Sequence, residues 1–139
     1  MGNRRQGRIL AFQALYWWEV TQPAVDQLLL FNWIDAEGEN SVASHAKDFA
    51  RLLIAGTVEN VETIDQHIRK QLHHWDFTRL ARVDLAILRV SVYALLFQNE
   101  IPASVTIDEA IDIAREFGGE ESYRFVNGVL DGVRKGVCA

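Results

Sequence analysis

The sequence predicts an all-α protein, a single bundle of about six to seven helices. Apolar residues recur at helical spacing in almost every long segment, and the alternation typical of strands is scarce. Only two prolines interrupt the 139 residues. Apolar residues make up 49% of the chain, enough for a real core, and no repeat or linker divides it. Residues 1–139 are therefore expected to form one domain.

The first two helices are expected on either side of Pro23, because the residue before a proline avoids the helical conformation. A helix over residues 5–21 carries on one stripe Ile9, Phe12, Tyr16 and Val20. A second helix over residues 24–36 contributes Leu28, Leu29, Phe31 and Trp33. Residues 37–41 form the clearest loop, and Ser41 or Ser44 can cap the helix that follows.

Two helices are expected over residues 42–75, because the helical pattern continues there for longer than the average helix of about 11–12 residues. The bend between them should lie near residues 60–63. The buried stripe of the first holds Phe49, Leu52, Leu53 and Val58. The buried stripe of the second holds Ile64, Ile68 and Leu72.

A central helix is expected to begin with Thr78 as its cap and to reach Gln98. One side of it carries Val83, Ile87, Val90, Ala94 and Phe97. Another side carries Leu85, Leu88, Val92 and Leu95. Because this segment is apolar nearly all round, it should be packed by several neighbouring helices.

The last two helices are predicted from their end signals. Thr106 and Glu109 have the spacing of a capping box, and that helix should run to Phe117. Gly118 and Gly119 can supply a left-handed helix end, and Ser122 is a candidate cap for a final helix reaching about residue 135. The inner face of this final helix is expected to hold Val126, Val129, Leu130 and Val133.

The chain is acidic overall but begins with a basic segment. The formal charge is -5, and the +3 of the first eight residues leaves -8 for the rest. Arg4 and Arg8 share a helix face, Arg5 lies beside them, and Tyr16 follows two turns later. Guanidinium groups suit phosphates and an exposed aromatic ring suits an unstacked base, a combination used to bind single-stranded RNA. The alternative for Tyr16 is an ordinary core residue with a wet hydroxyl.

Neither a catalytic nor a metal or cofactor site is predicted. His73 and His74 are adjacent, so on a helix they diverge by about 100° and cannot converge on one ion. Carboxylate pairs such as Asp108 with Glu109 fit capping and helix-dipole roles. Cys138 has no nearby histidine to activate it. The sequence therefore predicts a protein that is not an enzyme.

The longest apolar run, residues 92–97, is far shorter than the roughly twenty residues of a membrane-spanning helix. No cleavable leader is recognisable either, which favours a cytoplasmic protein.

Two residues do not fit a purely structural helix. Arg89 interrupts the most apolar helix, so it must be paired, reach outward or face a ligand. Phe125 lies off the inner stripe, where it can contact a base or partner or simply pack in the core.

Four groups of residues, in order along nearly the whole chain, carry a family resemblance. They are Arg4-Arg5 with Arg8 and Gln13–Tyr16; Asp84–Arg89 with Val92-Tyr93; Ile101-Pro102 with Val105–Ile111; and Phe117-Gly118 with Ser122 and Phe125–Asp131. Together they make the chain resemble the NusB family of bacterial transcription antitermination factors. The last group is the most specific, because it is long and its spacing to Ile101-Pro102 also agrees.

The resemblance implies a small helical protein that binds boxA-type single-stranded RNA of ribosomal RNA leaders together with NusE, a protein of the small ribosomal subunit. That complex would join elongating RNA polymerase with other Nus factors. By position, the resemblance implies RNA contacts for Arg4, Arg5, Arg8 and Tyr16, with Glu121 and Phe125 near the same surface. It implies a partner-binding role for Asp84, Arg89 and Tyr93.

Two alternatives stay open at this point. The chain can be an adaptor that contacts RNA only within the NusE complex. At Tyr93-Ala94 the family commonly has a Tyr-Glu pair, so this chain lacks a carboxylate on that possible partner surface. It can also be the NusB-like accessory domain of an RNA methyltransferase. Since the chain ends at Ala139 without a catalytic continuation, we expect the methyltransferase interpretation to fail.

Overall fold

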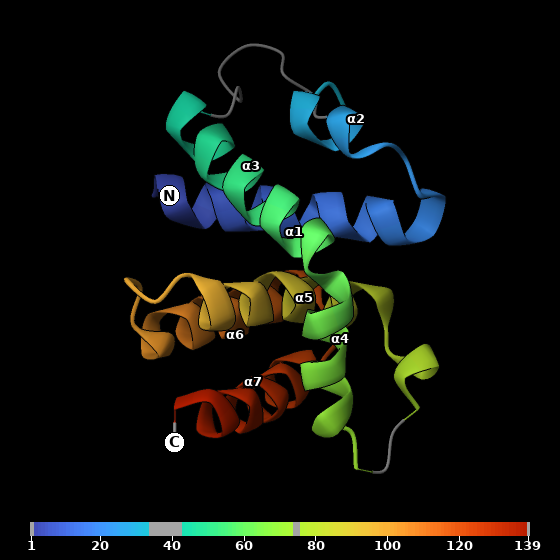
Figure 1. The fold of residues 1–139 in the computed structure, drawn as a ribbon, viewed down its shortest axis with the longest axis vertical. Coiled ribbons are helices and arrows are strands. Elements are labelled where there is room, and N and C mark those ends of the chain that lie inside the picture. The colour runs from blue at the N-terminus through green and yellow to red at the C-terminus, as the bar shows by residue number, and fades with distance from the viewer. Residues whose placement is uncertain (1, 34–42, 74–75, 139) are drawn as a thin grey trace.

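The computed structural model describes residues 2–33, 43–73 and 76–138, and the predicted all-α class is confirmed (Figure 1). Seven α-helices and one short 3-10 helix lie within these residues. They are α1 (Asn3–Thr21), α2 (Val25–Leu30), α3 (Ser44–Glu59), α4 (Val61–Lys70), η2 (Phe77–Arg79), α5 (Arg82–Phe97), α6 (Ala103–Phe117) and α7 (Ser122–Cys138). None of the helices in these ranges is long and apolar enough to cross a membrane.

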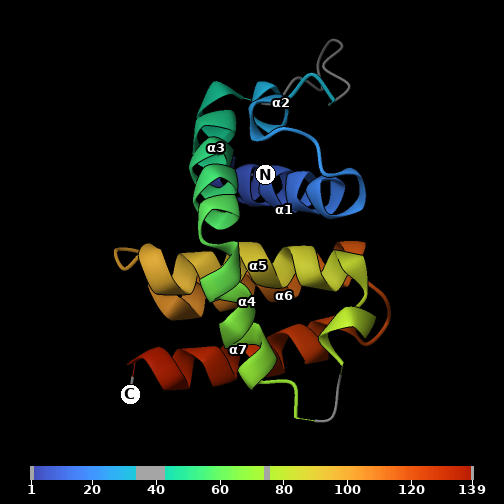
Figure 2. The same cartoon turned by 45° about the vertical axis from the view of Figure 1, so that its right-hand side comes forward.

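The helices form two groups joined through α4. In both views α1, α2 and α3 occupy one end of the molecule and α5, α6 and α7 the other (Figures 1 and 2). α1 packs across α3, and α6 packs against α7. The break between α3 and α4 falls at Asn60, as predicted, and α4 then descends beside α5 to reach α7.

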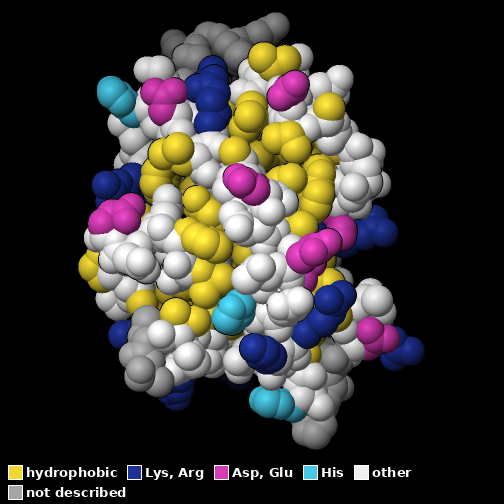
Figure 3. Space-filling view, viewed as in Figure 1, with side chains coloured by type: hydrophobic (Ala, Val, Ile, Leu, Met, Phe, Trp, Pro, Cys, Tyr) yellow, Lys and Arg dark blue, Asp and Glu magenta, His cyan; other side chains and the backbone are white. Residues whose placement is uncertain are grey.

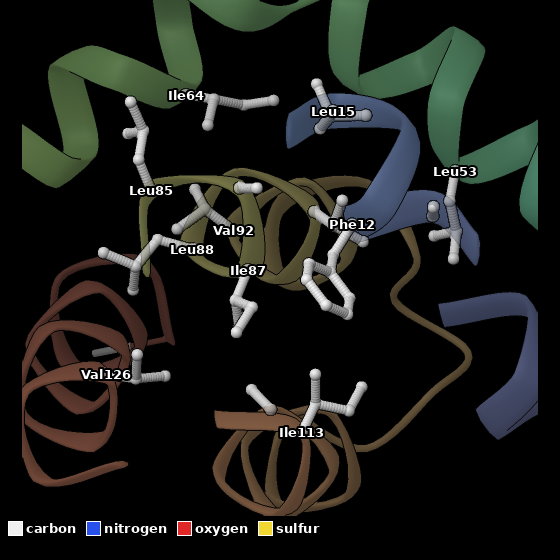
Figure 4. Close-up of a cluster of buried hydrophobic side chains, with 14 of the residues drawn as sticks. Phe12, Leu15, Leu53, Ile64, Leu85, Ile87, Leu88, Val92, Ile113 and Val126 are labelled. Atoms are coloured by element: carbon white, nitrogen blue, oxygen red, sulfur yellow. The ribbon is translucent and has the colours of Figure 1, made fainter. Parts of the chain in front are cut away.

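The helix α5 is central, as its apolar character predicts. It contacts α1, α3, α4, α6 and α7. Figure 4 shows side chains of α5 pointing outward in several directions, with Ile87 toward Ile113 of α6 and Leu88 toward Val126 of α7. The predicted inner face of α7 is confirmed, since Val126, Val129, Leu130 and Val133 are all buried. This packing fixes the start of α5, around which the surface hollows described below are arranged.

The second helix is shorter than predicted. α2 ends at Leu30, and Phe31 takes a left-handed backbone conformation with φ of 57°. Phe31 is nevertheless buried, beside the ring of Trp33 and under the guanidinium of Arg51. Residues 34–36, the predicted loop at 37–41 and the candidate cap Ser41 lie outside the described residues. Ser44 is the first residue of α3, and the N-cap position is taken by Ala43, so Ser44 is not the cap.

Two predicted threonine caps are wrong. Asp76 accepts hydrogen bonds from the backbone N–H of Thr78 at 3.0 Å and from its hydroxyl at 2.8 Å, so Thr78 lies in η2 instead of capping α5. α5 begins after Ala81. α6 begins directly after Pro102, so Thr106 lies inside the helix and no capping box forms. Glu109 instead contacts arginines of α1.

The turn between α6 and α7 is not left-handed. Gly118 is extended, with φ of -91°, and glycine is required there by space: a Cβ would lie 2.6 Å from that of Ser122. The Ser122 hydroxyl accepts a hydrogen bond from the backbone N–H of Gly119 at 2.9 Å. Among the predicted buried residues, Leu52 is 64% exposed, because its neighbour Leu53 takes the core-facing position, and Phe97 is also exposed.

Candidate nucleic-acid interface

The first turns of α1 hold the three arginines predicted for RNA, and α6 supplies carboxylates to two of them. The Arg5 Nε donates to Glu109 Oε2 at 2.7 Å, and its Nη2 donates to Asp112 Oδ2 at 2.8 Å. The Arg8 Nη1 donates to Glu109 Oε1 at 3.2 Å. The hydrogen bonds that Arg5 donates to Glu109 are the main cause that raises the pKa of Arg5. Glu109 was predicted to serve a helix end, and it binds arginines instead.

The three arginines differ in exposure. Arg8 is only 8% exposed and lies 5.4 Å from the centre of the Phe49 ring, and burial lowers its pKa against the opposing effect of Glu109. Arg4 is exposed, and no carboxylate of the described chain lies within 4.0 Å of it. Of the three, Arg4 is therefore the one whose charge is not already compensated.

Hollows surround the start of α5. The first, which we call the tyrosine hollow, has a volume of about 200 Å³ and is lined by Phe12, Gln13, Tyr16, Val83 and Phe117. Tyr16 is 40% exposed, which favours the predicted base contact over a core role. The centres of the Phe12 and Phe117 rings lie 5.1 Å apart, and both rings line the tyrosine hollow.

A larger hollow is lined by Asp84, the residue of α5 that follows Val83. This phenyl hollow has a volume of about 410 Å³ and is lined by Arg79, Leu80, Ala81, Asp84, Gly119, Glu121, Ser122 and Phe125. Phe125 is half-buried, so one part of its ring lies in the core and another lines the hollow. Glu121 is exposed at the rim and lies 3.7 Å from Arg124. The structure thus brings Glu121, Phe125 and Asp84 together.

The carboxylate of Asp84 forms no ion pair within the described part of the chain. It is 9% exposed, and its Oδ1 is buried with no hydrogen-bond partner among the residues described. Burial raises the pKa of Asp84, and a hydrogen bond from Ser122 opposes that effect. The residue predicted to contact a partner therefore lines the wall of the phenyl hollow and is not a protruding surface group.

Arg89 and Tyr93 lie deeper on α5. Arg89 is 5% exposed, and its Nε and Nη2 donate to the two carboxylate oxygens of Asp65 at 3.0 and 2.9 Å. Its Nη1 donates to Glu19 at 3.4 Å. Of the three options predicted for Arg89, the structure has the paired one. Tyr93 is half-buried and lies so close over Gly56 that a Cβ there would fall 2.2 Å from the tyrosine ring.

A third hollow holds residues that the sequence analysis did not select. We call it the arginine cleft; its volume is about 400 Å³, and its walls include Arg69, Phe77 and Arg82. Within the described ranges no group of His, Cys, Asp and Glu could hold a metal ion. His74 lies outside those ranges.

Comparisons with known proteins point to one family. The model of the NusB family matches residues 5–135. The chain is 48% identical to the transcription antitermination protein NusB of Treponema pallidum (strain Nichols) over 133 residues, covering 96% of this chain and 93% of that protein. It is 44% identical to the protein of that name from Bacillus cereus (strain ATCC 10987) over 132 residues, covering 95% and 97%.

Solved structures agree. The structure of T. maritima NusB superposes with a TM-score of 0.82 at 41% identity, covering 95% of this chain and 90% of that one. A chain in the crystal structure of the antitermination factors NusB and NusE in complex with dsRNA superposes with a TM-score of 0.83 at 28% identity, covering 96% and 97%.

Proposed function

The chain belongs to the NusB family, and on that premise we propose that it binds boxA-type single-stranded RNA of ribosomal RNA leaders together with NusE. It acts as a transcription antitermination factor in the elongating RNA polymerase complex with other Nus factors, in the cytoplasm. It has no catalytic role, and residues 1–139 work as one RNA-binding domain. A solved relative that carries both NusE and RNA supports the two partners.

The observation that carries the proposal is the pair of aromatic hollows beside the start of α5. Tyr16 is exposed in one and Phe125 lines the other. Unpaired bases stack on such rings, and stacking contributes about 1–3 kcal/mol per base. Of the three N-terminal arginines, Arg4 offers its charge most freely to phosphates at the far end of α1, and Glu121 can accept hydrogen bonds from a base edge near Phe125.

The pairing of Arg5 and Arg8 with carboxylates favours a second version of this function, in which tight RNA binding depends on NusE. Because Glu109 and Asp112 already bind Arg5 and Arg8, the N-terminal segment offers RNA less positive charge than its sequence indicates. Tight RNA binding then requires NusE. For the partner surface we propose Asp84 and Tyr93, while Arg89 acts indirectly, by holding α5 against α4 and α1.

The test is a titration of labelled boxA-type RNA, as single strand and as duplex, with and without NusE. The substitution Tyr16→Leu should weaken binding of the single strand about ten-fold, because the stacking contact with one base is lost. For the titration without NusE, Phe97→Leu is the matched control, since Phe97 is an exposed aromatic residue at the opposite end of α5 that stacks on Tyr93 of the proposed partner surface. Failure of the unmodified chain to bind either RNA, alone or with NusE, would overturn the proposal.

A further inference from the structure

The arginine cleft is built by side chains from four segments of the chain. Glu19 comes from α1, Arg69 from α4, Phe77 from η2, and Arg82 and Leu85 from α5. The last turn of α4 is basic, and Figure 3 shows lysine and arginine side chains together with histidines over the position of α4. The cleft therefore lies within a cationic surface of an otherwise acidic protein.

The arginines of this surface lack carboxylate partners. Arg69, Arg79 and Arg82 are all exposed, and no described carboxylate lies within 4.0 Å of any of them. Arg69 and Arg82 line the same cleft, and Arg79 lines the hollow that shares Leu80 with it. Cations placed in this way repel one another, an arrangement that a polyanion relieves. Their charge is available to a ligand, in contrast to that of Arg5 and Arg8.

The Arg69 side chain is held in place without hydrogen bonds from its guanidinium N–H groups to described residues. Its guanidinium carbon lies 4.3 Å from the centre of the Phe77 ring, and no described residue accepts a hydrogen bond from it. A guanidinium held on an aromatic face keeps its in-plane N–H groups for a phosphate, which it can bind through two hydrogen bonds. The one carboxylate of the cleft, Glu19, is directed in part to the buried Arg89, at 3.4 Å.

The cleft is continuous with the proposed RNA surface. Leu80 lines both the arginine cleft and the phenyl hollow, and Arg79 lies beside it on the wall of the phenyl hollow. We infer that Arg69, Arg79 and Arg82 form a second phosphate-binding site, which holds the backbone of the RNA strand next to the base at Phe125. The inference rests on the proposed function and extends the RNA path from α1 around the start of α5 to α4.

The test compares the unmodified chain with Arg69→Gln/Arg82→Gln, both with NusE bound. Affinity is measured against salt concentration for a boxA-type strand and for the same strand extended by about six nucleotides at either end. Each lost phosphate contact lowers the salt slope by about 0.7 for single strands. The double variant should therefore bind an extended strand about ten-fold more weakly, with a slope smaller by about 1.4. The single variant Arg79→Gln, at an exposed side chain without an ion pair, should lower the slope by about 0.7.

The control is Arg134→Gln/Lys135→Gln, which removes the same formal charge at the far end of α7, where Lys135 pairs with Asp131 at 3.0 Å. Equal binding by the unmodified chain and both cleft variants would overturn the inference and leave RNA binding intact. An equal loss in cleft and control variants would also overturn it, as would a loss of NusE affinity without a change in RNA affinity. No RNA binding by the unmodified chain would overturn the proposed function together with the inference.

Discussion

The arginines that contact acidic side chains and those that line the arginine cleft differ in what surrounds them. Arg89 and Arg82 lie two turns apart on α5, yet Arg89 is enclosed by Asp65 and Glu19 whereas Arg82 is exposed without an ion pair among the described residues. Arg5 and Arg8 resemble Arg89 in this respect. The comparison teaches that the position of carboxylates in the fold, more than the count of arginines in a segment, decides which cations a ligand can use.

The largest effect should come from breaking the buried pair. Arg89→Leu should lower the free energy of unfolding by about 3–5 kcal/mol, because it leaves Asp65 buried without a counter-charge. The measurement is urea denaturation. Arg82→Leu makes the same chemical change on the same helix and should alter stability by less than about 0.5 kcal/mol. Similar losses in the two variants would contradict the comparison.

A smaller effect should follow from releasing the N-terminal arginines. Glu109→Gln should destabilise the fold by about 1–2 kcal/mol, since two guanidinium groups lose a shared negative charge and one of the two acceptor oxygens becomes an NH2 donor. The same change should strengthen RNA binding, because the charge of Arg5 is then offset by Asp112 alone and that of Arg8 by no carboxylate of the described chain.

The control for this release is Glu116→Gln, at an exposed carboxylate of the same helix that makes no ion pair in the described part of the chain. Both variants are measured by RNA titration and by urea denaturation. An equal gain of RNA affinity in the two would mean that net charge, and not the pairing of Arg5 and Arg8, limits binding.

The smallest effect concerns the buried carboxylate of Asp84. Burial raises the pKa of Asp84 in the folded state, so its ionised form destabilises the fold at neutral pH. Asp84→Asn should therefore raise stability at pH 7, by less than about 1 kcal/mol. The gain should shrink as the pH falls through the raised folded pKa and vanish below the unfolded value of about 3.9. Thermal unfolding between pH 3 and 7 provides the check, and a gain that grows toward acid would exclude this cause.

Helical periodicity predicted the core well because burial follows local spacing. The nearly continuous apolar surface of α5 correctly indicated a helix enclosed by several others. The end signals were less informative. Thr78 and Thr106 have the spacing of caps, but a cap also depends on where the neighbouring helix starts and on which groups compete for the side chain. Asp76 binds Thr78, and Pro102 starts α6 one turn before Thr106.

The candidate site was predictable only in part. The sequence indicated that Arg89 needs a partner, but Asp65 and Glu19 lie 24 and 70 positions away, and only the packing of α1 and α4 on α5 selects them. The arginine cleft was missed for the same reason, since its walls come from four segments. The signal that could have found it was the pair Arg79 and Arg82 flanking the start of an apolar helix.

The central position of α5 has a consequence for synthesis on the ribosome. The polypeptide emerges from its N-terminus, so α1, α3 and α4 are complete before Arg82 is added. Until α5 follows, the sides of these three helices that face it have only one another to cover them. The nascent protein therefore exposes apolar surface over more than half of its translation, and α5 is the segment whose arrival closes it.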